Sequence, residues 1–174
     1  MSPSNDASQA APRAPFLLRE LPATVRLFLS GFLLTLSLGY GLGLLHVWEK
    51  TGMNVSGIQD RYGARETESH YAKSLGELLE TTHNHTITFS FIFLAVGSLF
   101  TATAVPPRLK LTLLVEPWVA IPVTMGSMFG TRYLSPLFGY TMFAASILTA
   151  CAFAAMVSLT LRELWLAPAG GRSR

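Results

Sequence analysis

The sequence has little cysteine and little charge: one cysteine, Cys151, in 174 residues, and 13% charged residues. A single thiol excludes an intrachain disulfide. The chain also lacks the zinc-protease pattern His-Glu-x-x-His, the Gly-x-Ser-x-Gly nucleophile motif, a Gly-rich phosphate loop and the Cys-x-x-Cys-His of c-type haem attachment. Hydrolytic, nucleotide-driven and covalent-haem chemistry therefore have no support, and we predict a protein that is not an enzyme.

The scarcity of charge leaves four long stretches that are almost purely apolar. Hydrophobic residues make up 50% of the chain, and the mean hydropathy is +0.40. About 20 apolar residues in helical form cross a hydrocarbon layer of roughly 30 Å, and lipid forces the backbone to satisfy its own hydrogen bonds. We predict an all-α protein, a four-transmembrane-helix bundle with the lipid bilayer as its partner. Basic residues are scattered beside these stretches, which argues against nucleic acid.

The apolar stretches divide the chain into a membrane domain and two tails. We expect a disordered cytoplasmic tail over residues 1–22, a four-helix membrane domain over 23–166 and a flexible tail over 167–174. The predicted spans cover residues 24–48, 82–104, 109–131 and 137–165, and we expect the first to be retained as an uncleaved anchor. An outward loop over 49–81 has expected turns at Gly52, Gly57 and Gly63. It contains an amphipathic helix from residue 74, where Ser74 and Glu77 match a capping box and lead without a break into the second span.

Basic residues at the ends of the spans predict the orientation. Three lie in the N-terminal tail or at the start of the first span, two in or beside the turn after the second span, and three at the C-terminal flank of the fourth. The positive-inside rule then places both termini in the cytoplasm. We expect a multi-pass protein of a bacterial inner membrane, with the 49–81 loop on the periplasmic side.

Three of the four histidines lie where spans meet the outward side: His46, His83 and His85. Residues two apart on a helix point about 200° apart, so His83 and His85 do not easily chelate one ion together. We predict His46 and His85 as a cross-helix pair for haem b, and His83, His85 and His70 as candidate ligands of a transition metal. The alternatives are interfacial rings hydrogen-bonded to neighbours and a role in proton transfer, and the sequence does not identify a cofactor.

Glu116 lies inside the third predicted span, before Pro117 and near Trp118. An ionisable side chain within the membrane is by default a functional hypothesis. Glu116 and Trp118 could hold a quinone headgroup or pass protons. The alternatives are a protonated carboxyl bonded to a neighbouring helix and a hydrated one near the cytoplasmic surface.

A ridge of small residues follows the first predicted span. Gly31, Thr35, Gly39 and Gly43 recur every four residues, the spacing that allows close contact between helices in membranes. His46 shares this face. We expect the ridge to pack, either within the bundle or against other membrane subunits.

The segment Leu78–His85, LLETTHNH, resembles a family of small, poorly characterised four-helix bacterial inner-membrane proteins. These share a Leu-Leu-x-Thr-Thr-His-x-His segment before the second transmembrane helix. Family members often have another histidine further along that helix, where this chain has Gly97-Ser98. The resemblance implies association with membrane redox systems, and it carries no established reaction.

These observations lead to three functional hypotheses. The first is a small integral membrane subunit of a respiratory or photosynthetic type of electron-transfer assembly, binding haem b or a metal through outward histidines. The second is a non-catalytic structural or assembly subunit that packs against a larger membrane complex. The third is a small proton-coupled carrier that uses Glu116.

Overall fold

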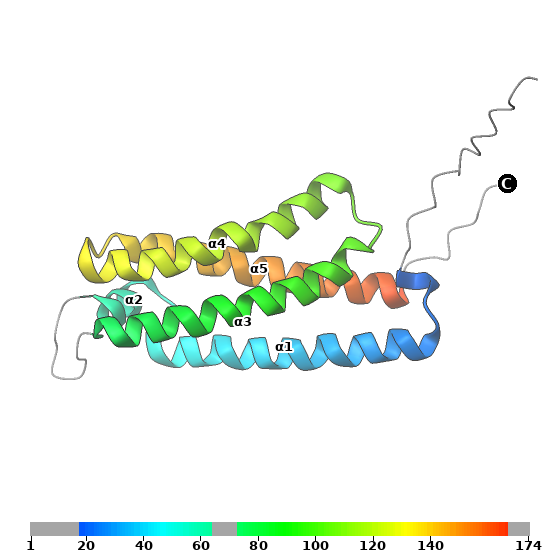
Figure 1. The fold of residues 1–174 in the computed structure, drawn as a ribbon, viewed down its shortest axis with the longest axis horizontal. Coiled ribbons are helices and arrows are strands. Elements are labelled where there is room, and N and C mark those ends of the chain that lie inside the picture. Colours follow the sequence, from blue (N-terminus) through cyan, green and yellow to red (C-terminus); the bar gives the residue numbers. More distant parts are fainter. Residues whose placement is uncertain (1–17, 64–72, 167–174) are drawn as a thin grey trace, which may run out of the picture.

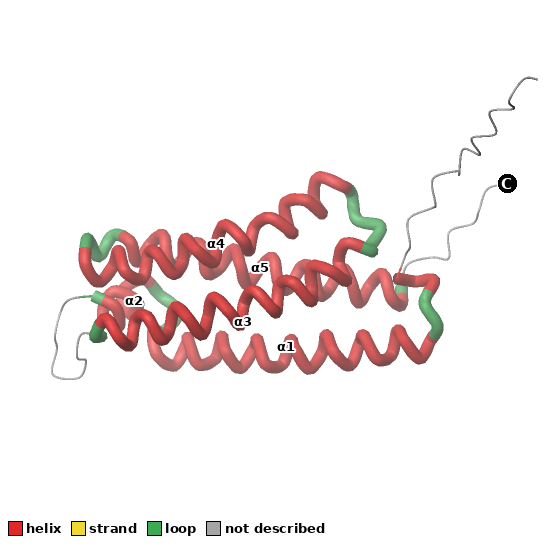
Figure 2. Tube along the Cα trace, in the orientation of Figure 1, coloured by secondary structure: helices red, strands yellow, loops and turns green. Residues whose placement is uncertain are grey.

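The computed structural model describes residues 18–63 and 73–166, which form five α-helices, one short 3-10 helix and no β-strand. The predicted all-α class is confirmed. Four helices are long: α1 (Ala23–Thr51), α3 (Leu75–Thr101), α4 (Pro107–Tyr133) and α5 (Phe138–Trp165). They run side by side along the long axis of the molecule and reverse direction at each connection (Figure 1). Loops are confined to the two ends of this bundle (Figure 2).

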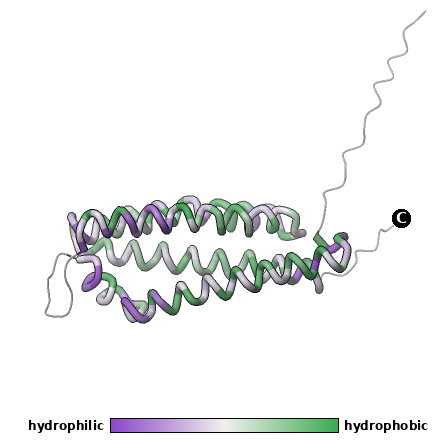
Figure 3. Tube along the Cα trace, turned by 60° about the horizontal axis from the view of Figure 1, so that its bottom comes forward, coloured by the Kyte–Doolittle hydropathy of each residue, from purple (hydrophilic) through white to green (hydrophobic). Residues whose placement is uncertain are grey.

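The long helices have the dimensions of membrane spans. Each has 27 to 29 residues, or about 40 to 44 Å at 1.5 Å per residue. All four are apolar enough to cross a bilayer. Green and pale segments run along their lengths, while purple segments gather mainly toward the ends (Figure 3). The predicted four-helix membrane bundle is confirmed.

The start of α3 follows the predicted capping box. The amide of Ser74 donates to Glu77 Oε2 at 2.7 Å, and the amide of Glu77 donates to Ser74 Oγ at 3.3 Å. The helix continues unbroken from Leu75 to Thr101, as expected. It ends three residues before the predicted position 104, because the amides of Ala102 and Thr103 turn back to the carbonyls of Leu99 and Phe100.

Residues 18–22, which the sequence analysis assigned to the disordered tail, pack against the bundle. Leu18–Glu20 form the short 3-10 helix, and Leu18 is 2% exposed. The amide of Leu18 also donates to the carbonyl of Ala102, which follows α3. The assignment of residues 18–22 to a disordered tail is therefore wrong, because Leu18 is apolar and packs in the core. Residues 1–17 and 167–174 lie outside the described part of the chain.

The outward loop contains a helix that the sequence analysis missed, α2 (Val55–Tyr62). The Asn54 side chain caps it by accepting from the amide of Gly57 at 2.8 Å, and Ile58 is buried. Gly57, expected as a turn, lies inside this helix. The sequence contains a pattern that indicates this helix, because Asn54 can cap it and Val55 and Ile58 follow at helical spacing. The helix was missed because most residues of the segment are polar.

Helix α2 lies against one end of the bundle and is tied to the connection between α4 and α5. Gln59 Nε2 donates to the carbonyl of Pro136 at 2.9 Å, and Arg132 donates to the carbonyl of Gly63 at 3.3 Å. The side chain of Gln59 also packs on Gly139 at the start of α5. The polar helix thus caps α4 and α5 at one end of the bundle. This end is named the outer end, after the orientation that the basic residues predict.

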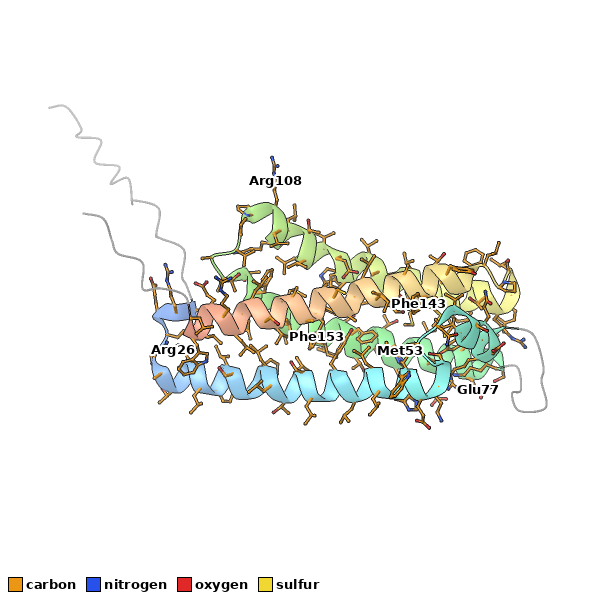
Figure 4. All side chains as sticks on the ribbon, turned by 180° about the vertical axis from the view of Figure 1, so that it is seen from behind. Arg26, Met53, Glu77, Arg108, Phe143 and Phe153 are labelled. Carbon is orange, nitrogen blue, oxygen red and sulfur yellow. The ribbon has the colours of Figure 1, made fainter. Side chains whose placement is uncertain are left out.

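At the opposite end, hydrogen bonds join the start of α1 to the end of α5. Arg26 donates to the carbonyl of Leu164 at 3.0 Å and lies 4.9 Å from the centre of the Trp165 ring. Trp165 Nε1 in turn donates to Ser30 Oγ at 2.8 Å. Arg26 is labelled beside the end of α5 in Figure 4.

Helices α4 and α5 are the most extensively buried pair of spans, while α1 lies at the edge of the bundle. Pro117 and Pro122 lie inside α4, which continues through both. Each removes a backbone donor and favours a bend, and the N-terminal half of α4 leans away from the other helices (Figure 1). Arg108, near the tip of that half, projects away from the bundle (Figure 4).

The contact between α2 and the end of α1 can be tested at Gly57. A Cβ at this position overlaps the carbonyl of Thr51, so we expect Gly57→Ala to lower the free energy of unfolding by about 1 to 3 kcal/mol. Thermal unfolding of the detergent-purified protein measures this effect. Gly41→Ala is the control, because its Cβ meets no described atom within 4 Å. Equal stability of the two variants would contradict the described packing.

Candidate functional site

The outer end of α3 carries His83 and His85, and both side chains are exposed. His85 Nδ1 lies 2.9 Å from the carbonyl of Thr81. Because a carbonyl can only accept, this contact assigns the proton to Nδ1 and leaves Nε2 with a free lone pair. The arrangement fixes the ring in the way that metal-binding histidines are commonly fixed.

His46 lies near the outer end of α1 and faces away from the bundle. Its side chain is 64% exposed, and Nδ1 is 3.7 Å from Glu49 Oε2. The inward face of α1 is marked by its half-buried and buried residues, including Leu33, Tyr40 and Leu44. At 100° per residue, His46 is about 140° from that face. It instead lines a shallow surface concavity of about 520 Å³, together with Leu42, Leu45, Trp48 and Glu49.

The structure does not bring the predicted histidine pair together. His46 points away from the interior, which does not fit a haem held between α1 and α3. Within residues 18–63 and 73–166, no group of three or more His, Cys, Asp or Glu side chains is placed to hold a metal ion. His70 lies outside the described residues. Ligation by these histidines stays a prediction.

An aromatic cluster connects His85 to the core of the bundle. The ring of His85 meets Phe89 edge-on at 5.7 Å, and Phe89 is 6.2 Å from Tyr40 of α1. Tyr40 stacks on Phe153 of α5 at 4.0 Å, and Phe93 contacts both phenylalanines. Sequence reasoning missed this cluster. The four-residue spacing of Phe89 and Phe93 signals one face of α3, but no pattern indicates which aromatic residues of α1 and α5 face it.

Lys73 adds a partly shielded positive charge between α2 and α3. Its ammonium lies 5.3 Å from the centre of the Tyr62 ring. Partial burial, and then the nearby Arg61, lower the pKa of Lys73 below its ordinary value. The outer end of the bundle therefore mixes basic groups with the acidic residues at the start of α3.

Glu116 occupies the interior of a membrane span, as predicted, and both of its carboxylate oxygens are buried. They have no hydrogen-bond partner among the described residues. The hydroxyl of Thr149 on α5 lies beside the carboxylate but already donates to the carbonyl of Ala145 at 3.0 Å. Tyr40 on α1 interacts electrostatically with the carboxylate. Trp118, by contrast, is on the outer surface and is 48% exposed, so the two residues do not share a site.

The small-residue ridge of α1 also faces outward. Gly31, Thr35, Gly39 and Gly43 are all exposed. A Cβ added at any of the three glycines would meet no described atom within 4 Å beyond its own helix and chain neighbours. The ridge therefore takes no part in packing among the helices of this bundle.

Comparison with known proteins places the chain in a family. Residues 52–170 match the family Aq_1264_TM, described as a transmembrane helical domain. The chain belongs to this family. The match covers α2 and the last three long helices, and α1 lies outside it. No curated protein and no solved structure matches. Together with the four span-like helices, the match establishes a multi-pass integral membrane protein.

The orientation of the histidine-bearing end can be tested with single cysteines in a Cys151→Ala background. His83 and Arg108 are both exposed. His83 lies in the N-terminal part of α3, and Arg108 lies in the first turn of α4, which follows the C-terminal end of α3. If both termini are cytoplasmic, His83→Cys reacts with a membrane-impermeant maleimide in intact spheroplasts. Arg108→Cys then reacts only after the membrane is opened. The reverse pattern would contradict the predicted topology.

Proposed function

We propose that this protein is a non-catalytic subunit of a larger complex in a bacterial inner membrane, and that α1 is the helix through which it docks. The observation that carries the proposal is the direction of the small-residue ridge. In lipid, helices associate through close van der Waals packing, which small side chains permit. A ridge that faced inward would pack against other helices of the bundle. This ridge is exposed on the outside of α1, where a helix of another subunit can pack against it.

The shape and packing of α1 agree with this role. Only 11% of its most apolar stretch is buried, against 39% in α4 and in α5. Its exposed apolar residues surround the ridge, and they include Phe28, Leu34, Leu38 and Leu42. A partner helix on the ridge would also reach His46 and the concavity near Trp48 at the outer end. The predicted partner is therefore a transmembrane helix of another subunit.

An electron-transfer role is the second candidate function. The aromatic cluster supports it, because ring contacts of 4.0 to 6.4 Å run from the exposed His85 to Phe153 in the core. His85 also keeps Nε2 available for a ligand. In this proposal, the second ligand of a haem or metal comes from a partner subunit, because His46 faces away from the interior of the bundle.

Leucine substitutions on α1 test the docking proposal. We expect Gly39→Leu and Gly43→Leu to weaken association with the native complex roughly tenfold, about 1.4 kcal/mol. Sedimentation of complexes gently solubilised from native membranes measures the association. Gly41→Leu is the matched control, because it lies on the same exposed helix but on another face. All three side chains enter open space, so the isolated subunit should keep its stability.

The ridge is not the docking surface if all three variants remain in the complex, or if Gly41→Leu has the same effect as the other two. Co-purification of two differently tagged copies tests the partner. Recovery of the second tag, lost with Gly39→Leu, would identify the partner as another copy of this chain, and the proposal of a different subunit would then be wrong.

Absorption spectra test the electron-transfer candidate. For protein from its native membrane, we expect a Soret band, or near-stoichiometric iron or copper, that is lost in His85→Ala. His83→Ala is the control, since His83 is exposed two residues away on another face of α3. A colourless and metal-free sample that still contains its partner subunits would contradict this role.

A further inference from the structure

Glu116 has an environment that disfavours its charged form. Both carboxylate oxygens are buried, and neither has a hydrogen-bond partner among the described residues. An ionised carboxylate buried without a counter-ion is strongly destabilised, and the group instead takes up a proton. The position is also deep, since Glu116 is nine residues into α4, or about 13 Å along the helix.

No cation of the described chain neutralises Glu116. Its interacting neighbours are the hydroxyls of Thr149 and Tyr40. The three basic groups of α4 lie at its ends: Arg108 projects away from the bundle, Lys110 donates to the carbonyls of Thr101 and Thr103, and Arg132 donates to the carbonyl of Gly63. The titratable groups of the other packed helices lie toward the ends of the bundle, apart from Cys151 on α5. Besides Tyr40, already named, they are Arg26, His46, Glu49 and Lys50 on α1, Asp60, Arg61 and Tyr62 on α2, Glu77, Glu80, His83 and His85 on α3, and Tyr140, Arg162 and Glu163 on α5.

The backbone beside Glu116 supplies an acceptor for a carboxylic acid. Pro117 has no N–H, so the carbonyl of Leu113 loses the donor that a regular helix provides four residues later. Leu113 is one turn before Glu116 and on a neighbouring part of the same face. A protonated Glu116 can donate to such a carbonyl, and an ionised one cannot.

We propose that Glu116 is a proton-binding site inside the bundle. The carboxyl holds one proton in the membrane-embedded state and releases it as a carboxylate and a free proton. Exchange takes place through the end of the bundle where α4 leans away from its neighbours, because the helix before Pro117 is the least enclosed part of α4 (Figure 1). This site is independent of the docking ridge on α1.

Carbodiimide labelling tests the proposal on the full chain in native membrane vesicles. The lipid-soluble dicyclohexylcarbodiimide adds to a protonated carboxyl and rearranges to a stable N-acylurea, which peptide mass spectrometry locates. We expect labelling of Glu116 at neutral pH that falls as the pH rises, because the carboxylate does not react. Glu116→Gln should abolish this label. Glu163→Gln, which alters the other buried carboxyl of the spans, should leave the Glu116 label unchanged.

Infrared spectroscopy provides a second measurement that does not depend on access of the reagent. We expect a carboxylic-acid C=O band at neutral pH that is missing in Glu116→Gln and retained in Glu163→Gln. Absence of this band, or labelling that does not change with pH, would overturn the proposal. Protection of Glu116 from labelling by NaCl relative to choline chloride at constant pH would also overturn it, because Na⁺ would then be the bound cation.

Discussion

A peptide group in lipid finds no partner outside its own chain, and this constraint governs the whole structure. It requires four stretches of the chain to be helical regardless of their individual residue preferences. It also explains why irregular backbone occurs at the two ends of the bundle (Figure 2). The prolines of α4 are the exception within a span, and they coincide with the bend of that helix and with its buried carboxyl.

The features that depend on lipid and on local chain chemistry could be predicted from the sequence. The four spans follow from apolar length, and the start of α3 follows from Ser74 and Glu77, whose side chains and amides satisfy each other. The burial of Glu116 follows from its place in an apolar run. Each of these depends on residues close together in the chain, so one sequence is sufficient to find them.

The features that depend on which helix faces which could not be predicted. Helix α1 is apolar on every side, so no pattern indicates that His46 and the glycine ridge face outward. The aromatic contacts of Tyr40 and Phe153 join residues 113 positions apart in the chain. Leu18 is buried because it packs in a core that other segments of the chain form. These arrangements arise from packing between helices, which spacing along the chain does not encode.

The placement of α2 makes the two ends of the molecule unequal. It contacts α1, α4 and α5 and is hydrogen-bonded to the turn that joins α4 to α5. Helix α2 therefore covers one end of the bundle, whereas at the other end α4 diverges from its neighbours (Figure 1). The two ends of α4 are therefore held unequally: its C-terminal end is fixed to α2 by the hydrogen bond from Arg132 to Gly63, whereas its first residues are mostly exposed.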